Sequence, residues 1–457
     1  MKSHEEQGSQ TQLESTAQPN SDNSDIGQSP PPPPDKGLQA WLQVAGVFFC
    51  WFNSWSGHHS PNGFDILLTR RIFRGLSNAF GVFQTYYEQE LPQSPSVISW
   101  IGSIQALLLI GVGILAGPAY DAGFFTELIW TGTVLVPFGF MMTSLASKFW
   151  QIILAQGVIV GIGMGCLFIP SVSILPQWFS QRRVLANALA ASGASFGGTI
   201  YPILLYRLLN YTSVGFPWAV RILGFFALGT SLVSCALLKV RSTPPKRRLL
   251  FDFKAYREPP FALYTISLFF ALIGIYIPTF YIQLHALKAH SPPMASTNMA
   301  AYILPILNAG AIPGRIVPGF VANKTGVLNL FSLLLAWAGI VTLCWPAVTN
   351  LAGLIVYALV YGFAFGGILS LPPPAVMALS PDLGVVGTRF GTCVSLASFG
   401  VLIGTPIGGA ILHSKKTDIT DNFLGLQLFA GLVLLIGAGV CLLARSMKVG
   451  WELKGKI

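Results

Sequence analysis

The feature that most constrains this chain is a series of apolar runs, each long enough to cross a lipid bilayer. A hydrocarbon core of about 30 Å needs roughly 20 apolar residues in a helix. Only 10% of the residues are charged, whereas a soluble domain carries roughly 25%. The sequence therefore predicts an all-α membrane protein. The continuous runs are 97–117, 127–147, 150–175, 186–209, 217–238, 261–284, 298–321, 327–347, 351–379, 390–412 and 423–444, and an interrupted run at 38–87 brings the prediction to twelve transmembrane helices.

Basic residues indicate how the helices are oriented. Seven Lys and Arg residues lie between positions 239 and 257, after the sixth run. Since these side chains resist translocation, the stretch is predicted to face the cytosol. Twelve helices return the chain to its starting side, so both termini are predicted to be cytosolic. We expect a multi-pass protein of the plasma membrane, with the vacuolar membrane as the alternative.

The runs divide the chain into two bundles joined by a linker. Residues 1–36 are polar and end in a proline run, which predicts a disordered cytosolic tail. The first six-helix bundle covers 37–238, and a cytosolic basic linker covers 239–260. The second six-helix bundle covers 261–446, and a short cytosolic tail follows over 447–457.

Two short motifs recur at nearly the same spacing. The segment Ala194–Gly197 (ASFG) recurs 203 residues later as Ala397–Gly400. A glycine-rich stretch that begins at Gly117 has a counterpart 202 residues later at Gly319. Together with the count of helices, the motifs favour two parallel six-helix repeats, which is the plan of the major facilitator fold.

Residues 56–74 (SGHHSPNGFDILLTRRIFR) interrupt the first run. An arginine at the centre of a spanning helix costs about 2.5–3.5 kcal/mol on the milder scale, and this segment holds three arginines. Without it, the flanking residues would join into one continuous apolar helix. We hypothesise that the segment is a translated, unspliced intron or a recent insertion.

The sequence lacks the residue patterns that several kinds of chemistry require. The chain has no phosphate-binding loop of the G-x-x-x-x-G-K-[ST] type, its six cysteines are dispersed, and no run carries Asp or Glu at its middle. Acid–base catalysis inside the membrane would need such carboxylates. We therefore expect no enzyme activity, no catalytic residue, no cofactor, no metal site and no nucleic-acid partner.

The remaining candidates for substrate binding are polar residues on the runs. Arg315 is ionisable and lies within a run, where burial of charge is expensive and usually functional. Its planar fork of donors matches a carboxylate, although an arginine near a helix end can also extend to the membrane surface. Asn308 lies about two turns away on the same face. Gln84 and Tyr276 are further candidates, as are Asn78, Gln156, Asn187 and Gln283, each of which could instead bond between helices.

Two other residues have a predicted role outside the membrane centre. Asp121 follows the second run, where a carboxylate at a helix end is expected to control conformation through nearby cations and helix dipoles. Asn210 begins the triplet Asn-Tyr-Thr on the predicted outer side, which is a glycosylation motif close to the membrane.

Three segments resemble the monocarboxylate transporter family, especially its fungal members. They are Asp35–Trp41 ahead of the first run, Trp178–Asn187 with its Arg182-Arg183 pair, and Gly314–Gly319 with Arg315. The resemblance spans about 37–446. It implies a major facilitator fold, conformational gating at Arg182 and Arg183, and substrate binding at Arg315, since the family's arginine matches that position. Animal members carry monocarboxylates with a proton.

The chain departs from that family at three charged or signature positions. Ala311 stands where the family has an aspartate one turn before its arginine, a position near Thr85 lacks the family's lysine, and Lys36 replaces a signature glycine. The mechanism of the animal lactate carriers therefore cannot simply be transferred.

We expect a secondary active or facilitative transporter in the lipid bilayer that moves a small organic molecule by alternating access. The expected substrate is a monocarboxylate-like acid or a related metabolite, and a proton is a candidate co-substrate. The first alternative is an exporter of a fungal secondary metabolite without proton coupling. A membrane nutrient sensor that transports nothing is an alternative of another class.

Overall fold

A computed structural model describes residues 34, 36–54, 83, 87, 90–93, 95–241, 253–288, 293–381, 386–413 and 419–450. The chain divides into Met1–Pro32 and Pro33–Ile457, and the second unit holds every described helix. The polar tail up to residue 33, the segment 56–74 and Gln84 lie outside the described residues, as do residues 242–252 of the basic linker and the last seven residues.

The described part is helical, with no β-strand among its elements. In the first half (the N-terminal half) the helices are α1 (Leu38–Ser54), α3 (Pro95–Gly111), α4 (Gly113–Asp121), α5 (Phe125–Leu145), α6 (Phe149–Ile152), the π-helix η1 (Ile153–Val160), α7 (Gly161–Trp178), α8 (Arg183–Tyr211) and α9 (Gly215–Leu237). Phe83, Tyr87 and Glu90 are also helical.

A short 3-10 helix, η2 (Phe253–Arg257), leads into the second half (the C-terminal half). This half consists of α10 (Pro259–Lys288), α11 (Thr297–Thr325), α12 (Val327–Cys344), the 3-10 turn η3 (Trp345–Ala347), α13 (Leu351–Ser370), α14 (Pro372–Leu379), α15 (Val386–His413) and α16 (Ile419–Val449). Eleven stretches of the described chain are long and apolar enough to span a membrane. With the shorter α1 ahead of them, they agree with the twelve predicted helices.

Local residues account for several helix ends. Asn350 caps α13, because its side chain accepts a hydrogen bond from the Gly353 amide at 2.7 Å. Gly326, with φ of 86°, ends α11 and starts α12 in a conformation that glycine adopts without strain. Prolines begin α14, where the first helical turn has no need of their missing amide hydrogen.

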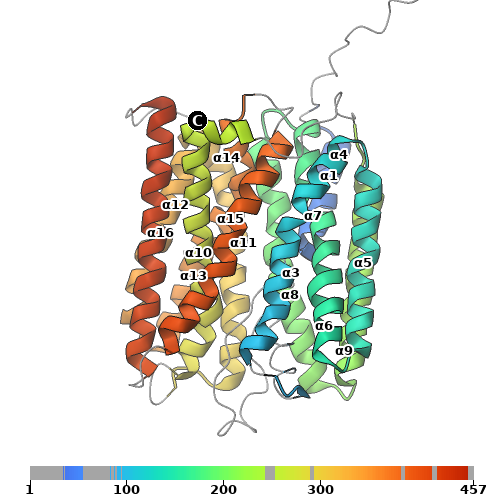
Figure 1. Cartoon of the computed structure of the whole chain (residues 1–457), viewed down its shortest axis with the longest axis vertical. Helices are drawn as coiled ribbons and strands as arrows, with labels where there is room; N and C mark the ends of the chain where they lie inside the picture. Colours follow the sequence, from blue (N-terminus) through green and yellow to red (C-terminus); the bar gives the residue numbers. More distant parts are fainter. Residues whose placement is uncertain are drawn as a thin grey trace, which may run out of the picture. The chain divides into compact units, whose positions relative to one another are not determined.

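The two halves pack in the same way. In the N-terminal half α1 contacts α8 and α9, and α5 contacts α7 and α9. In the C-terminal half the matching helices do the same: α10 contacts α15 and α16, and α12 contacts α13 and α16. The repeat predicted from the two short motifs is therefore a repeat of structure (Figure 1).

Glycines set the closest helix contacts. A β-carbon added at Gly157, Gly161 or Gly165 would lie 3.0–3.2 Å from the nearest atoms of α3. At Gly197 of α8 it would lie 2.2 Å from the Phe52 carbonyl oxygen of α1, and at Gly400 of α15 it would lie 2.5 Å from the Phe269 carbonyl oxygen of α10. Neither of these two equivalent helix crossings has room for a residue larger than glycine.

The two halves meet chiefly through α8 and α15. α8 packs against α11, and α15 packs against α3 and α4. At the end of the bundle that carries Asp121, Arg183, Met377 and Val449, which we call the basic end, Asn187 of α8 donates to the Ser370 carbonyl of α13 at 3.0 Å. Figure 1 shows α4 and α14 at the same end as the C-terminus. The halves are thus in contact at the basic end.

Candidate functional site

Arg315 lies at the contact between the two halves. It belongs to α11 of the C-terminal half, and only 2% of its surface is exposed. Its Nε donates a hydrogen bond of 2.8 Å to the Ser195 hydroxyl oxygen on α8 of the N-terminal half. The structure therefore holds a cationic side chain at the boundary between the two halves.

The Arg315 charge lacks full compensation among the described residues. Its Nη1 is buried and has no hydrogen-bond partner there. Ala311, one turn earlier on α11 and fully buried, supplies no carboxylate. A buried charge without a partner is costly, because neither water nor a counter-ion replaces its hydration. The site is therefore suited to an anionic group.

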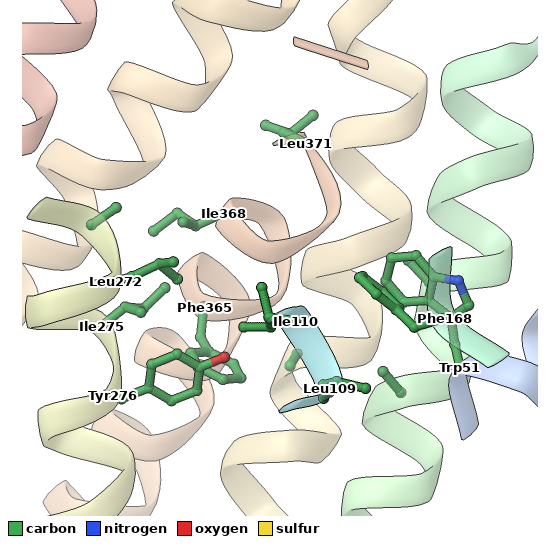
Figure 2. Close-up of a cluster of buried hydrophobic side chains, with 14 of the residues drawn as sticks. Trp51, Leu109, Ile110, Phe168, Leu272, Ile275, Tyr276, Phe365, Ile368 and Leu371 are labelled. Atoms are coloured by element: carbon green, nitrogen blue, oxygen red, sulfur yellow. The ribbon is translucent and has the colours of Figure 1, made fainter. Parts of the chain in front are cut away.

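Tyr276 of α10 lies close enough to Arg315 for an electrostatic interaction between the two side chains. Its ring contacts Phe365 of α13 edge to face, with centroids 5.9 Å apart, and Phe280 at 6.0 Å. Figure 2 shows Tyr276 and Phe365 in one cluster with Ile110 of α3, which belongs to the other half. Aromatic and aliphatic side chains thus surround Tyr276, which interacts electrostatically with the cation.

Asn308 takes part in helix packing. Its Nδ2 donates to the Leu304 carbonyl of its own helix at 3.1 Å. A β-carbon added at Gly198 of α8 would lie 2.9 Å from the Asn308 amide oxygen. The structure therefore places Asn308 at the crossing of α8 and α11, on the helix that carries Arg315, with part of its hydrogen-bonding capacity used locally.

The predicted gating residues lie at the basic end. Asp121 is the last residue of α4, and its side chain lies outside what the structure describes. Arg182 is exposed ahead of α8. Arg183 donates through Nε to the Phe179 carbonyl at 2.5 Å and through Nη1 to the Met377 sulfur on α14 at 3.7 Å. Arg183 is thus one contact between the halves.

The other candidates from the sequence include residues that pack between helices and one buried residue whose donor has no partner among the described residues. Gln156 of η1 accepts a hydrogen bond of 2.6 Å from the Tyr87 hydroxyl, and Asn187 bonds to α13, so both serve helix packing. Gln283 is 3% exposed, and its Nε2 has no partner among the described residues. Asn210 lies within α8, one residue before the helix ends.

Sequence reasoning missed two residue pairs. Ser195 was noted only as part of a repeated motif, yet it binds Arg315. Glu258 and Arg389 form a bidentate ion pair with N–O distances of 2.6 and 3.0 Å. The pair connects the start of α10 to α15. Arg389 lies one residue before the predicted run 390–412. A search for charges near both ends of each run would have found this pair.

The described residues contain no group of three side chains that could hold a metal ion. The site instead combines a cation, aromatic rings and a boundary between two halves. Such an arrangement can bind an apolar anion and respond to it by a change in how the halves pack.

Comparisons with known proteins agree with this geometry. Residues 71–399 match the family described as Major Facilitator Superfamily. The MFS-type transporter dbaD of Emericella nidulans is 43% identical over 89% of this chain and 86% of its own length. The aspyridones efflux protein apdF of the same organism is 37% identical over 93% and 81%. The fujikurins efflux protein of Gibberella fujikuroi is 34% identical over 91% and 84%.

The fold is also similar to that of a solved transporter. FucP in its outward conformation superposes with a TM-score of 0.63 at 15% identity, over 89% of this chain and 98% of that one. This likeness concerns the fold alone. These relatives are named as transporters or efflux proteins, not as enzymes. The chain is a membrane transporter and belongs to the Major Facilitator Superfamily.

Proposed function

We propose that this transporter exports an apolar organic anion, a fungal secondary metabolite, and that Arg315 binds its acidic group. The observation that carries the proposal is the buried Arg315 Nη1, which has no partner in the described part of the chain. An anionic substrate would supply the missing acceptor and charge. Tyr276 and Phe365 would contact the apolar part of the molecule.

Export is favoured over import by the relatives. Two proteins that match this chain over most of its length are named as efflux proteins for particular fungal metabolites. The resemblance to monocarboxylate transporters supports the acidic group but gives no direction of transport. Since no run carries a carboxylate at its middle, we propose that export does not depend on protonation of a buried Asp or Glu.

The substrate can be identified by comparing a deletion strain with its parent. We expect one or more acidic metabolites to accumulate inside the deletion strain and to decrease in its medium. Reintroduction of the gene should reverse both changes. An unchanged set of metabolites inside and outside the cells, under conditions in which the gene is expressed, would contradict export.

The role of Arg315 can then be tested by kinetics. Arg315→Lys keeps the charge but loses the planar fork, so affinity should fall. Arg315→Gln should weaken binding roughly tenfold to a hundredfold, since a hydrogen bond to a charged group contributes about 1.5–3 kcal/mol. Transport is measured per molecule of protein in the membrane. An unchanged half-saturation concentration in Arg315→Gln would contradict the proposal that Arg315 binds the substrate.

We propose further that the basic end faces the cytosol and that Asp121, Arg182 and Arg183 control conformation there. Arg183 supports this proposal through its contact with Met377 across the two halves. A reporter fused after Lys246 should be accessible only from the cytosol. Asp121→Asn should change turnover more than it changes the dependence on pH.

A further inference from the structure

A second buried donor lies on the Tyr276 side of α10. Gln283 follows Tyr276 by seven residues, which is two helical turns, so the two side chains share one face of the helix. The opposite face is occupied, because Gly274 packs on α16 and the His285 ring contacts Phe423 of α16 with centroids 5.2 Å apart. The Tyr276 face is the one that meets α13 and the central cluster of Figure 2.

Gln283 has the features of a ligand-binding side chain rather than a packing one. It is 3% exposed, and its Nε2 makes no hydrogen bond among the described residues. Gln156 and Asn187, which are also buried, both bond to a neighbouring helix. A buried amide donor without an acceptor destabilises the folded protein, so its presence on this face calls for a partner outside the chain.

We propose that Gln283 binds a hydrogen-bond acceptor of the substrate, such as a ketone, amide or ester oxygen. The rise of two helical turns separates Gln283 from Tyr276 by about 10 Å along α10. Arg315 interacts electrostatically with Tyr276. The substrate is therefore an elongated molecule with an acid at one end, an apolar or aromatic middle and a neutral acceptor at the other end. A short acid of the lactate type would leave Gln283 without a partner. This inference rests on the proposed role of Arg315.

Two matched probes separate the contribution of Gln283 to binding from that of Arg315. The first is 4′-acetylbiphenyl-4-carboxylate, whose ketone and carboxylate stand at opposite ends of an aromatic core. The second is 4′-ethylbiphenyl-4-carboxylate, which has the same length but lacks the acceptor. Binding of each to the full-length protein in detergent is measured by thermal stabilisation over a range of concentrations. The acetyl probe should bind about threefold to tenfold more tightly than the ethyl probe.

Variants assign that preference to one residue. In Gln283→Met the two probes should bind equally, whereas Arg315→Gln should weaken both probes by the same factor and keep their ratio. Gln427→Met is the control, because Gln427 is also buried and its Nε2 has no partner among the described residues, but it belongs to α16, which packs on the face of α10 opposite Tyr276. It should leave the ratio unchanged. The methionine variants remove an unpaired amide and are expected to fold.

The outcomes are distinct. Equal binding of the two probes to the unaltered protein, or a preference for the acetyl probe that survives in Gln283→Met, would overturn the inference. If Arg315→Gln changes neither affinity while the acetyl preference still depends on Gln283, the proposed role of Arg315 fails and the role of Gln283 stands.

Discussion

Ser195 of α8 and Ser398 of α15 occupy equivalent positions in the two repeats but make different hydrogen bonds. Ser195 accepts a bond of 2.8 Å from the Arg315 Nε of the other half. Ser398 donates to the Ser395 carbonyl of its own helix at 2.6 Å. Both serines are buried. The serine of the repeated motif thus makes a hydrogen bond between the halves in one copy and a hydrogen bond within its own helix in the other.

This difference predicts unequal effects of the same substitution. Ser195→Ala removes the acceptor that holds Arg315 Nε, so the guanidinium should become less well oriented and the half-saturation concentration should rise about threefold to tenfold. Ser398→Ala should leave it nearly unchanged. Transport normalised to membrane protein measures both, and equal effects of the two variants would show that Ser195 serves only to fill space.

A second prediction concerns the crossing of α11 and α13. A β-carbon at Gly314 would lie 2.0 Å from the Phe363 carbonyl oxygen, so Gly314→Ala should force the helices apart and destabilise the protein by about 1–3 kcal/mol. At Gly439 of α16 no atom of the described residues would lie within 4 Å of such a β-carbon, and Gly439→Ala should be neutral or stabilising. Thermal unfolding in detergent distinguishes the two. A Gly314→Ala protein as stable as Gly439→Ala would contradict the close packing.

A third prediction concerns the ion pair between Glu258 and Arg389. Arg389 is buried and also lies over the Phe261 ring at 5.4 Å, whereas the Glu258 side chain is 44% exposed. Glu258→Gln should therefore cost about 1–2 kcal/mol, less than the loss of a fully buried partner would cost. The exposed Glu127→Gln on α5 is the control and should change the melting temperature little. Equal shifts would show that the pair contributes nothing specific.

A fourth prediction concerns residues 56–74, which lie outside the described part of the structure. Phe52 and Phe269 are equivalent, since they contact the equivalent glycines Gly197 and Gly400. Gly117 lies 65 residues after Phe52, whereas the equivalent Gly319 lies 50 residues after Phe269. The N-terminal half thus has 15 extra residues there, close to the 19 residues of the interrupting segment.

We therefore expect mature transcripts in which the codons for 56–74 are absent. A protein without these residues should fold at least as well as the full chain, as judged by the fraction that runs as a single species in size-exclusion chromatography. Uniform presence of the segment in mature mRNA would defeat the intron hypothesis. Loss of folding on its removal would defeat the insertion hypothesis as well.

The helices could be predicted from sequence because membrane insertion depends on a sum over many residues. The run predicted at 351–379, for example, matches the observed span Leu351–Leu379, and an error at single positions would not have changed it. The site was predicted only in part. Arg315 was recognisable alone, because one charge in an apolar run is conspicuous. Its bond to Ser195 was not, since the two residues are 120 positions apart and meet only through the rotation and crossing of α8 and α11.

The π-helix η1 has a consequence for how the length of this chain can vary during evolution. In most helices the loss of one residue turns everything beyond it by about 100°, which would move Gly161 and Gly165 away from α3. A π-helix holds a surplus residue in its wider turns, so a deletion between Ile153 and Val160 can be absorbed when those turns tighten to α-helix. Descendants of this sequence can therefore shorten the fourth transmembrane helix here by one residue and keep the glycine face directed at α3.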